Sequence, residues 1–182
     1  YFTSHPCNFK PTEVTKWSLY GLRKLFLEKN KKNKKKYKKV FIIRDQIELI
    51  DKQNLSKYSS YRILLNEDEI KNFLKTRGFE IIKPEDYSFK DQIKIFSNAD
   101  YVIGMYGAAM MMLAFCKKGT KILEIKPTKA GKEFKKISDK LFLQHKEIKL
   151  TPIFKSSVPQ NGLLICNLKK IKSDLSNFGL NV

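Results

Sequence analysis

The stretch Asp100-Tyr-Val-Ile-Gly-Met-Tyr-Gly-Ala-Ala-Met110 decides the fold class of this 182-residue chain. Its apolar start predicts a buried strand that ends at Gly104, and Gly107 predicts a tight turn into a helix that begins at Ala108. In parallel sheets such a turn presents free amide groups to a ligand, and glycine lets a phosphate approach the backbone. A Gly-x-x-Gly turn is also common as a plain strand-to-helix connection, and it matches neither the dinucleotide fingerprint nor the Walker loop. Both interpretations, an anion site and a structural turn, stay open at this point.

Short apolar runs and amphipathic stretches alternate on both sides of this turn. The runs predict strands over 40–44, 79–83, 101–104, 121–125, 148–154 and 163–166, with helices beginning at Asn66, Ser88, Ala108, Gly131 and Asn167. Asn66 with Glu69 forms a capping-box pattern, and Gly78 stands where a helix C-terminus favours glycine. Strands that alternate with helices favour parallel pairing. We therefore predict an α/β fold, a Rossmann-like parallel sheet covered by helices.

The N-terminal part differs in composition from the rest of the chain. Residues 12–28 show helical apolar spacing, with Pro11 and Thr12 as start signals, and residues 29–39 contain eight lysines. So dense a charge block favours a solvated linker over a binding patch. We predict an N-terminal helix and lysine-rich linker over 1–39 and a Rossmann-like domain over 40–182.

The overall composition limits the class of protein. Hydrophobic residues make up 42% and charged residues 30%, which is typical of a globular protein and excludes global disorder. The longest apolar stretch is shorter than the ~20 residues that cross a bilayer. Cys7, Cys116 and Cys166 are widely spaced and odd in number, so neither a disulfide framework nor a zinc site is indicated. A reducing, cytoplasmic compartment is expected.

The net charge of +19 raises the question of nucleic-acid binding, since lysines that neutralise phosphates gain affinity by counterion release. Of the 37 basic residues, only Arg23, Arg44, Arg62 and Arg77 are arginine, the side chain that base readout and phosphate forks favour. The aromatic residues do not alternate with basic ones as on a stacking platform. Nucleic-acid binding is therefore kept only as the least favoured alternative.

A few polar residues stand out against this predicted fold. Arg44 ends the first predicted strand of the sheet, where a guanidinium suits a diphosphate or is simply a surface cation. Glu124 interrupts an apolar strand, where it could bind a ribose diol or face solvent at a sheet edge. His5 and His145 show no metal spacing, so we predict surface or cap positions for them and no metal site. The methionines 110–112 are expected to pack a helix against the sheet.

Several linked motifs stand in a fixed order along the chain. They are Arg44, Tyr61–Glu69, Gly78-Phe79, Pro84-Glu85, Ser88–Ile93, Ala99-Asp100, Ile103–Ala108, Phe115, Gly119-Thr120, Leu123–Ile125 and Pro127. Together they resemble glycosyltransferase family 61, strongly over residues 40–127. That family includes bacterial capsular-polysaccharide biosynthesis proteins, plant xylosyl- and arabinosyltransferases and animal O-linked N-acetylglucosamine transferases.

The resemblance implies an inverting transfer of a sugar from a nucleotide donor, a UDP-sugar, to a glycan or other hydroxyl acceptor. It also implies a GT-B architecture, of which this chain holds mainly the C-terminal, donor-binding domain, without a tightly bound cofactor or metal. An N-terminal domain outside the chain, a role in surface or capsular polysaccharide synthesis, and peripheral contact with the inner face of the membrane follow as expectations. The resemblance places the donor at Arg44, Arg62, Ser88, Gln92, Gly104, Tyr106, Gly107, Ala108 and Glu124.

The glycine turn departs from the family pattern Gly-x-His-Gly-Ala-x-Leu-x-Asn. Tyr106 stands in place of the histidine, Met110 of the leucine and Met112 of the asparagine. Because a tyrosine has a pKa near ~10, it is a poor general base at neutral pH, so the catalytic residue is left unassigned. The alternative is a catalytically degenerate module that binds nucleotide sugars or another protein.

Overall fold

The computed structural model describes residues 14–27, 37–44, 50–51, 53–154 and 156–181. Its main sheet has five strands in the order β3-β1-β4-β5-β6, and every neighbouring pair is parallel. The strands are β1 (Lys39–Ile42), β3 (Glu80–Ile82), β4 (Tyr101–Met105), β5 (Lys121–Pro127) and β6 (Gln144–Leu150). The predicted Rossmann-like parallel sheet is confirmed.

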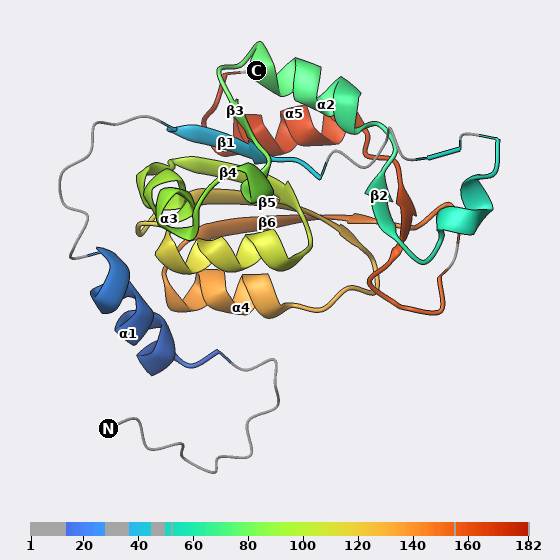
Figure 1. The fold of residues 1–182 in the computed structure, drawn as a ribbon. Coiled ribbons are helices and arrows are strands. Elements are labelled where there is room, and N and C mark those ends of the chain that lie inside the picture. Colours follow the sequence, from blue (N-terminus) through green and yellow to red (C-terminus); the bar gives the residue numbers. More distant parts are fainter. Residues whose placement is uncertain (1–13, 28–36, 45–49, 52, 155, 182) are drawn as a thin grey trace.

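Helices cover both faces of this sheet (Figure 1). They are α1 (Lys16–Leu27), α2 (Glu67–Lys75), α3 (Phe89–Asn98), α4 (Glu133–Lys140) and α5 (Leu168–Asn177), with 3-10 helices η3 (Leu55–Tyr58), η4 (Pro84–Asp86) and η5 (Ala108–Phe115). One core lies between the sheet and α3, η5 and α4, and a second lies between the sheet and α2 and α5. Alternate residues of each strand, such as Val102 and Ile103, are buried on opposite faces, as a two-sided sheet requires.

Two strand predictions needed correction. Residues 162–164 form β7 (Gly162–Leu164), which leaves the main sheet and pairs in parallel with β2 (Arg62–Leu64), a strand that the pattern did not predict. The strand predicted over 148–154 is β6, which begins at Gln144 and ends at Leu150. Because β6 is the edge strand and carries mostly polar residues, its apolar pattern was too weak to mark its start.

The predicted helix signals mark the correct positions, but only Gly78 acts as predicted; Asn66 does not. Gly78 follows α2 with a φ of 75°, the left-handed conformation that glycine adopts without strain. Asn66 occupies the N-cap position of α2, but its side chain does not cap the helix. Its Oδ1 accepts from Cys166 N (3.0 Å) and its Nδ2 donates to Cys166 O (2.8 Å). The capping-box interpretation is therefore wrong: Asn66 joins the ends of β2 and β7.

The helix after the glycine turn begins at Ala108 as predicted, but it is a 3-10 helix. Met110 and Met112 are buried as expected for packing residues, whereas the side chain of Met111 is 46% exposed. The methionine run therefore serves the core at two of its three positions.

The first helix is shorter than its pattern predicted. It begins at Lys16, with Thr15 Oγ1 accepting from Ser18 N (3.1 Å); Pro11, Thr12 and most of the lysine block lie outside the described residues. Arg23 donates to Ala114 O (2.8 Å) and Cys116 O (2.7 Å), so α1 is tied to the end of η5. The division at residue 39 stays a prediction. No helix in the described part of the chain has the length and apolarity to cross a membrane.

Candidate functional site

A pocket of about 440 Å³ opens where β1 and β4 end. Its walls are Ile42, Ile43, Arg44, Pro84, Glu85, Gln92, Met105, Gly107, Ala108, Ala109 and Met112. Strands β1 and β4 are neighbours with Ile42 paired to Gly104, so the residues that follow them emerge side by side. The tertiary structure thus brings Arg44 to the glycine turn, although they are more than 60 residues apart in sequence.

The missing side chain of Gly107 makes this approach possible. A Cβ atom built there would lie 3.0 Å from Arg44 Nη2 and 3.3 Å from Arg62 Nη1. Both guanidinium groups therefore rest against the bare backbone of the turn. The next residues begin η5, whose first amide groups have no partner within the helix. Donors from side chains and backbone converge at this end of the sheet, as an anion site needs.

Arg62 lies behind Arg44 and holds the turn in place. Its Nε donates to Gln160 O (2.5 Å), Nη1 to Tyr106 O (2.5 Å) and Nη2 to Asn161 Oδ1 (3.1 Å). Arg44 Nη1 donates in turn to Arg62 O (3.1 Å). Arg62 is absent from the pocket wall, so its direct role is to position Tyr106 and Arg44.

The two guanidinium groups stand in a partly dehydrated environment. Burial lowers the pKa of Arg44, an effect that the nearby Glu67 and Glu85 carboxylates oppose. Burial, and next the charge of Arg44, lower the pKa of Arg62. Arginine stays protonated at neutral pH even so. Two like charges held close together out of water favour an anion between or beside them.

Glu67 fixes the backbone at Arg44. Its carboxylate accepts from Arg44 N through both oxygens (3.2 and 3.3 Å), and only 6% of Glu67 is exposed. The residue is therefore more than a helix start, since it holds the strand end from which Arg44 points into the pocket.

The opposite wall offers hydrogen-bond acceptors. Gln92 Nε2 donates to Pro84 O (2.9 Å) and Tyr87 O (3.1 Å), which holds the η4 turn against α3. With that nitrogen engaged, the group that Gln92 can offer to the pocket is its amide oxygen. Glu85 contributes a carboxylate to the same wall. Glu85 belongs to one of the motifs that resemble the family, but it was not among the predicted donor residues. Its place in the first turn of η4 also suits the charge preference of a helix N-terminus, so no local signal marked it as a pocket residue.

Two other predicted site residues are explained by the fold. Ser88 caps α3: its Oγ accepts from Asp91 N (3.2 Å) and donates to Asp91 Oδ2 (2.6 Å). Gly104 lies beneath the pocket, where a Cβ atom would be 3.0 Å from Met110 Sδ and 3.1 Å from Ile42 Cδ1. Neither residue lines the pocket.

Tyr106, at the position of the family histidine, turns away from the pocket. Its hydroxyl donates to Glu133 Oε2 (2.9 Å), and its ring lies 4.8 Å from Arg62 Cζ and 5.3 Å from Lys126 Nζ. Burial, and next the hydrogen bond to Glu133, raise the pKa of Tyr106 to about 12. The phenol is therefore neutral at physiological pH and acts as a donor.

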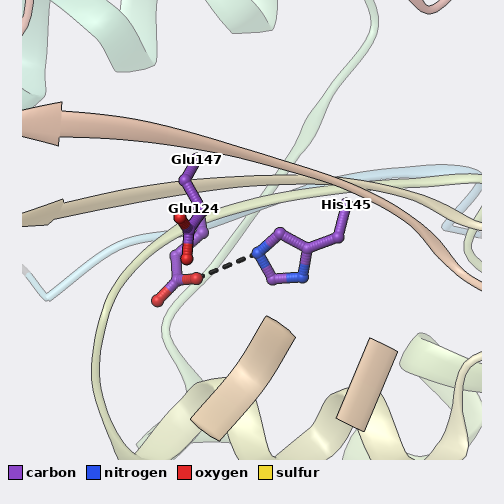
Figure 2. Close-up of side chains that lie close together, drawn as sticks. All are labelled: Glu124, His145 and Glu147. Carbon is purple, nitrogen blue, oxygen red and sulfur yellow. Dashed lines mark hydrogen bonds and ion pairs between the residues drawn. The ribbon is translucent and has the colours of Figure 1, made fainter. Parts of the chain in front are cut away.

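Glu124 lies in the core. Its side chain is 0% exposed, and its Oε2 lies 2.9 Å from Nε2 of His145 (Figure 2). Its Oε1 lies 3.6 Å from Lys126 Nζ. The predicted alternative of a solvent-facing sheet edge is wrong, because β5 runs between β4 and β6. Glu124 is not among the residues of the pocket wall, and its contact with a donor ribose stays a prediction. His145, whose side chain is 0% exposed, is likewise no surface residue.

Glu124, His145 and Glu147 place one potential metal-ligating atom each within 4.8 Å of one another (Figure 2). Lys126 already lies among them: its Nζ is 2.9 Å from Glu147 Oε1 and also donates to Gly131 O. Ser138 Oγ completes the group at 2.6 Å from His145 Nδ1. Since a metal ion would have to displace this buried ammonium, we assign these residues to the core and name them the β5–β6 ionic cluster.

The fold and the pocket define a Rossmann-like α/β domain with an anion-favouring site at the carboxyl ends of its strands. Comparison with known sequences shows the family: the profile of Glycosyltransferase 61 matches residues 1–123, and the chain belongs to that family.

The chain is also similar to the EGF domain-specific O-linked N-acetylglucosamine transferases of several vertebrates. The mouse and chicken proteins are each 34% identical over 76 residues, and the chimpanzee protein is 33% identical over the same length. The match covers 39% of this chain and 14% of each relative.

Proposed function

We propose that the pocket binds the diphosphate of a nucleotide-sugar donor, with Arg44 and the amides of Gly107 and Ala108 as its contacts. The observation that supports this proposal is that two half-buried guanidinium groups contact the backbone of a glycine turn at the start of a helix. Charge-assisted hydrogen bonds to phosphate are among the stronger polar contacts in proteins. Family membership supports sugar transfer, and the site supplies the anion-binding half of that chemistry.

The pocket wall formed by Glu85 and Gln92, which carries hydrogen-bond acceptors, suits the sugar and ribose of such a ligand. Sugar and ribose hydroxyls donate hydrogen bonds, and the Glu85 carboxylate and Gln92 oxygen accept them. We propose a UDP-sugar that lies across the pocket, with its diphosphate at Arg44 and a diol at Glu85. The chain then corresponds to the C-terminal, donor-binding half of a GT-B enzyme.

In an inverting transfer, the acceptor hydroxyl attacks the sugar as the diphosphate leaves and a base takes its proton. Arg44 and the turn amides stabilise the negative charge that builds on the departing diphosphate. Tyr106 with a pKa of about 12 is unsuited to the base role. We propose that a second domain supplies the base and binds the hydroxyl acceptor. We also propose that the enzyme acts in surface-polysaccharide synthesis in the cytoplasm.

A second candidate function rests on Tyr106. With its phenol engaged by Glu133, the family histidine position offers no base to the pocket. A domain that binds nucleotide sugars without turnover fits this arrangement. Release of nucleotide from UDP-sugars by the wild-type protein and by Tyr106→His separates the two candidates. Turnover by the wild-type protein contradicts the binding-only domain, whereas no turnover by the wild-type protein, alone or with turnover restored in Tyr106→His, favours it.

Ligand-induced stabilisation tests donor binding directly. UDP, GDP and CDP are added in turn to the protein, and the shift of its melting temperature is measured, since a ligand of the native state raises it. We expect a shift with UDP that Arg44→Ala abolishes. The control is Arg77→Ala, which removes an arginine that stacks on Phe73 instead of lining the pocket. An undiminished shift in Arg44→Ala would exclude Arg44 from the site.

A deoxynucleotide tests the proposed contact between the ribose diol and Glu85. Wild-type protein should bind UDP more tightly than 2′-deoxy-UDP, and Glu85→Ala should reduce that preference by weakening UDP binding alone. Equal preference in the two proteins would move the diol away from Glu85 without affecting the diphosphate assignment.

A further inference from the structure

The outward face of α1 is apolar and exposed. Trp17 is 74% exposed, Leu25 55%, Tyr20 52% and Leu22 41%, whereas Leu19 on the opposite face is 1% exposed. Exposed apolar side chains are normal one at a time, but Trp17, Tyr20 and Leu25 lie toward one side of the helix and form a patch, with Leu22 at its margin. Figure 1 shows α1 at the edge of the domain. We name this patch the α1 face.

Positive charge surrounds the α1 face. The helix carries the exposed Lys16 and Lys24 and contains no acidic residue, whereas Arg23 is directed toward η5. Beside its start, the ring of Phe142 lies 5.8 Å from Lys16 Nζ and 5.5 Å from Lys118 Nζ. The patch is thus an apolar surface with a basic margin.

Phe142 is held on this surface against its backbone preference. Its φ is 57°, in the left-handed region that bulky residues avoid, and it is 58% exposed. Such a conformation costs about 1–3 kcal/mol, and exposure returns little hydrophobic stabilisation. Among the described acidic residues near Phe142, Asp139 pairs with Lys135, and Asp100 pairs with Lys117 at 2.5 Å. They therefore add little repulsion toward an anionic surface.

We propose that the α1 face docks on the surface of a membrane that contains anionic lipid. An aromatic and leucine face beside lysines is typical of helices that lie in the membrane interface, where tryptophan and tyrosine rings prefer the headgroup level. Lysines near an anionic leaflet add about 1 kcal/mol each, and their alkyl chains can follow the apolar surface. A nucleic acid offers no apolar layer for Trp17 and Leu25, so lipid is the better match to both features.

The single tryptophan of the chain makes the test specific, because Trp17 lies within the α1 face. The protein is mixed with vesicles of phosphatidylcholine alone or with 30% phosphatidylserine, and emission wavelength and co-sedimentation are recorded. We expect a blue shift and sedimentation with the serine lipid only, both weakened by salt. The emission shift distinguishes burial of this face from attraction to other lysines.

Two matched pairs of variants complete the design. Tyr20→Ser/Leu25→Ser and Lys16→Glu/Lys24→Glu change exposed residues of the α1 face, and each should weaken vesicle binding at least tenfold. Ile165→Ser and Lys169→Glu/Lys172→Glu make the same kinds of change at exposed positions near or on α5, over the opposite face of the sheet. These controls should bind as wild type does.

Three results would overturn the proposal. They are no preference for phosphatidylserine, equal loss in the α5 controls, and a blue shift without lipid that grows with protein concentration, which means self-association. The proposal goes beyond the pocket, so the UDP-induced melting shift should be the same in all four variants.

Discussion

The pocket and the β5–β6 ionic cluster both contain charged side chains, but these side chains have different partners and different roles. In the cluster, carboxylates and ammonium groups contact each other directly: Glu147 lies 2.9 Å from Lys126 Nζ and 3.4 Å from Lys149 Nζ. At the pocket, the guanidinium groups of Arg44 and Arg62 donate to neutral oxygens. Charge that is paired inside the protein holds the fold, whereas the oriented guanidinium of Arg44, whose charge the nearby Glu67 and Glu85 carboxylates balance only in part, is available to a ligand.

This comparison predicts its largest effect in the cluster. Glu124→Ala leaves Lys126 and His145 buried beside a cavity, and we expect a loss of about 3–5 kcal/mol in the free energy of unfolding. Urea denaturation measures it. Glu80→Ala, at an exposed position of β3, is the control and should change stability by less than about 0.5 kcal/mol. A loss below about 1 kcal/mol for Glu124→Ala would contradict the structural role of the cluster.

The next effect belongs to the pocket. Gly107→Ala places a Cβ atom 3.0 Å from Arg44 Nη2 and 3.3 Å from Arg62 Nη1. Because the ends of arginine side chains can shift, we expect little change in stability and about a tenfold loss of UDP affinity, equal to ~1.4 kcal/mol. Calorimetric titration measures the affinity.

Gly21→Ala is the matched control for this substitution. A Cβ atom at Gly21 meets nothing within 4 Å, and the residue lies inside α1. It should leave UDP affinity unchanged and raise stability by about 0.5–1 kcal/mol, since alanine is the better helix former. Normal UDP binding by Gly107→Ala would show that the turn does not position the guanidinium groups.

The smallest effect is expected at Tyr106, whose ring lies near Arg62 beside the pocket and near Lys126 in the β5–β6 ionic cluster. Tyr106→Phe removes the hydrogen bond to Glu133, so we expect a loss of about 0.5–1.5 kcal/mol at neutral pH and unchanged UDP affinity. The folded pKa of Tyr106, about 12, lies above the ordinary value near ~10. Its contribution is thus complete below pH ~10 and is lost as pH rises toward 12.

Unfolding measured from pH 8 to 12 should therefore show an alkaline loss of stability that is smaller in Tyr106→Phe. Identical pH profiles for the two proteins would mean that the phenol is not held neutral by its surroundings. A large loss of UDP affinity in the variant would instead place the hydroxyl at the ligand.

The central strands could be predicted from local pattern because their neighbours bury them on both faces. β1, β4 and β5 lie inside the sheet and are largely apolar, and the observed bounds follow the predicted runs closely. The polar edge strand β6 and the short β2–β7 sheet could not be predicted as well. Arg62 and Asn161 are close only because β2 and β7 pair, and no local signal joins residues nearly 100 positions apart.

The candidate site divides in the same way. The sequence determined that a glycine turn follows a buried strand and that an arginine ends another, since apolar runs and glycine act locally. Only the tertiary structure decided which charges meet. The strand order brings Arg44 to Gly107, and the fold around Gln92 places Glu85 in the pocket. The fold also buries Glu124 beside His145 and Lys126, and the role of a charge depends on its partners and its access to water.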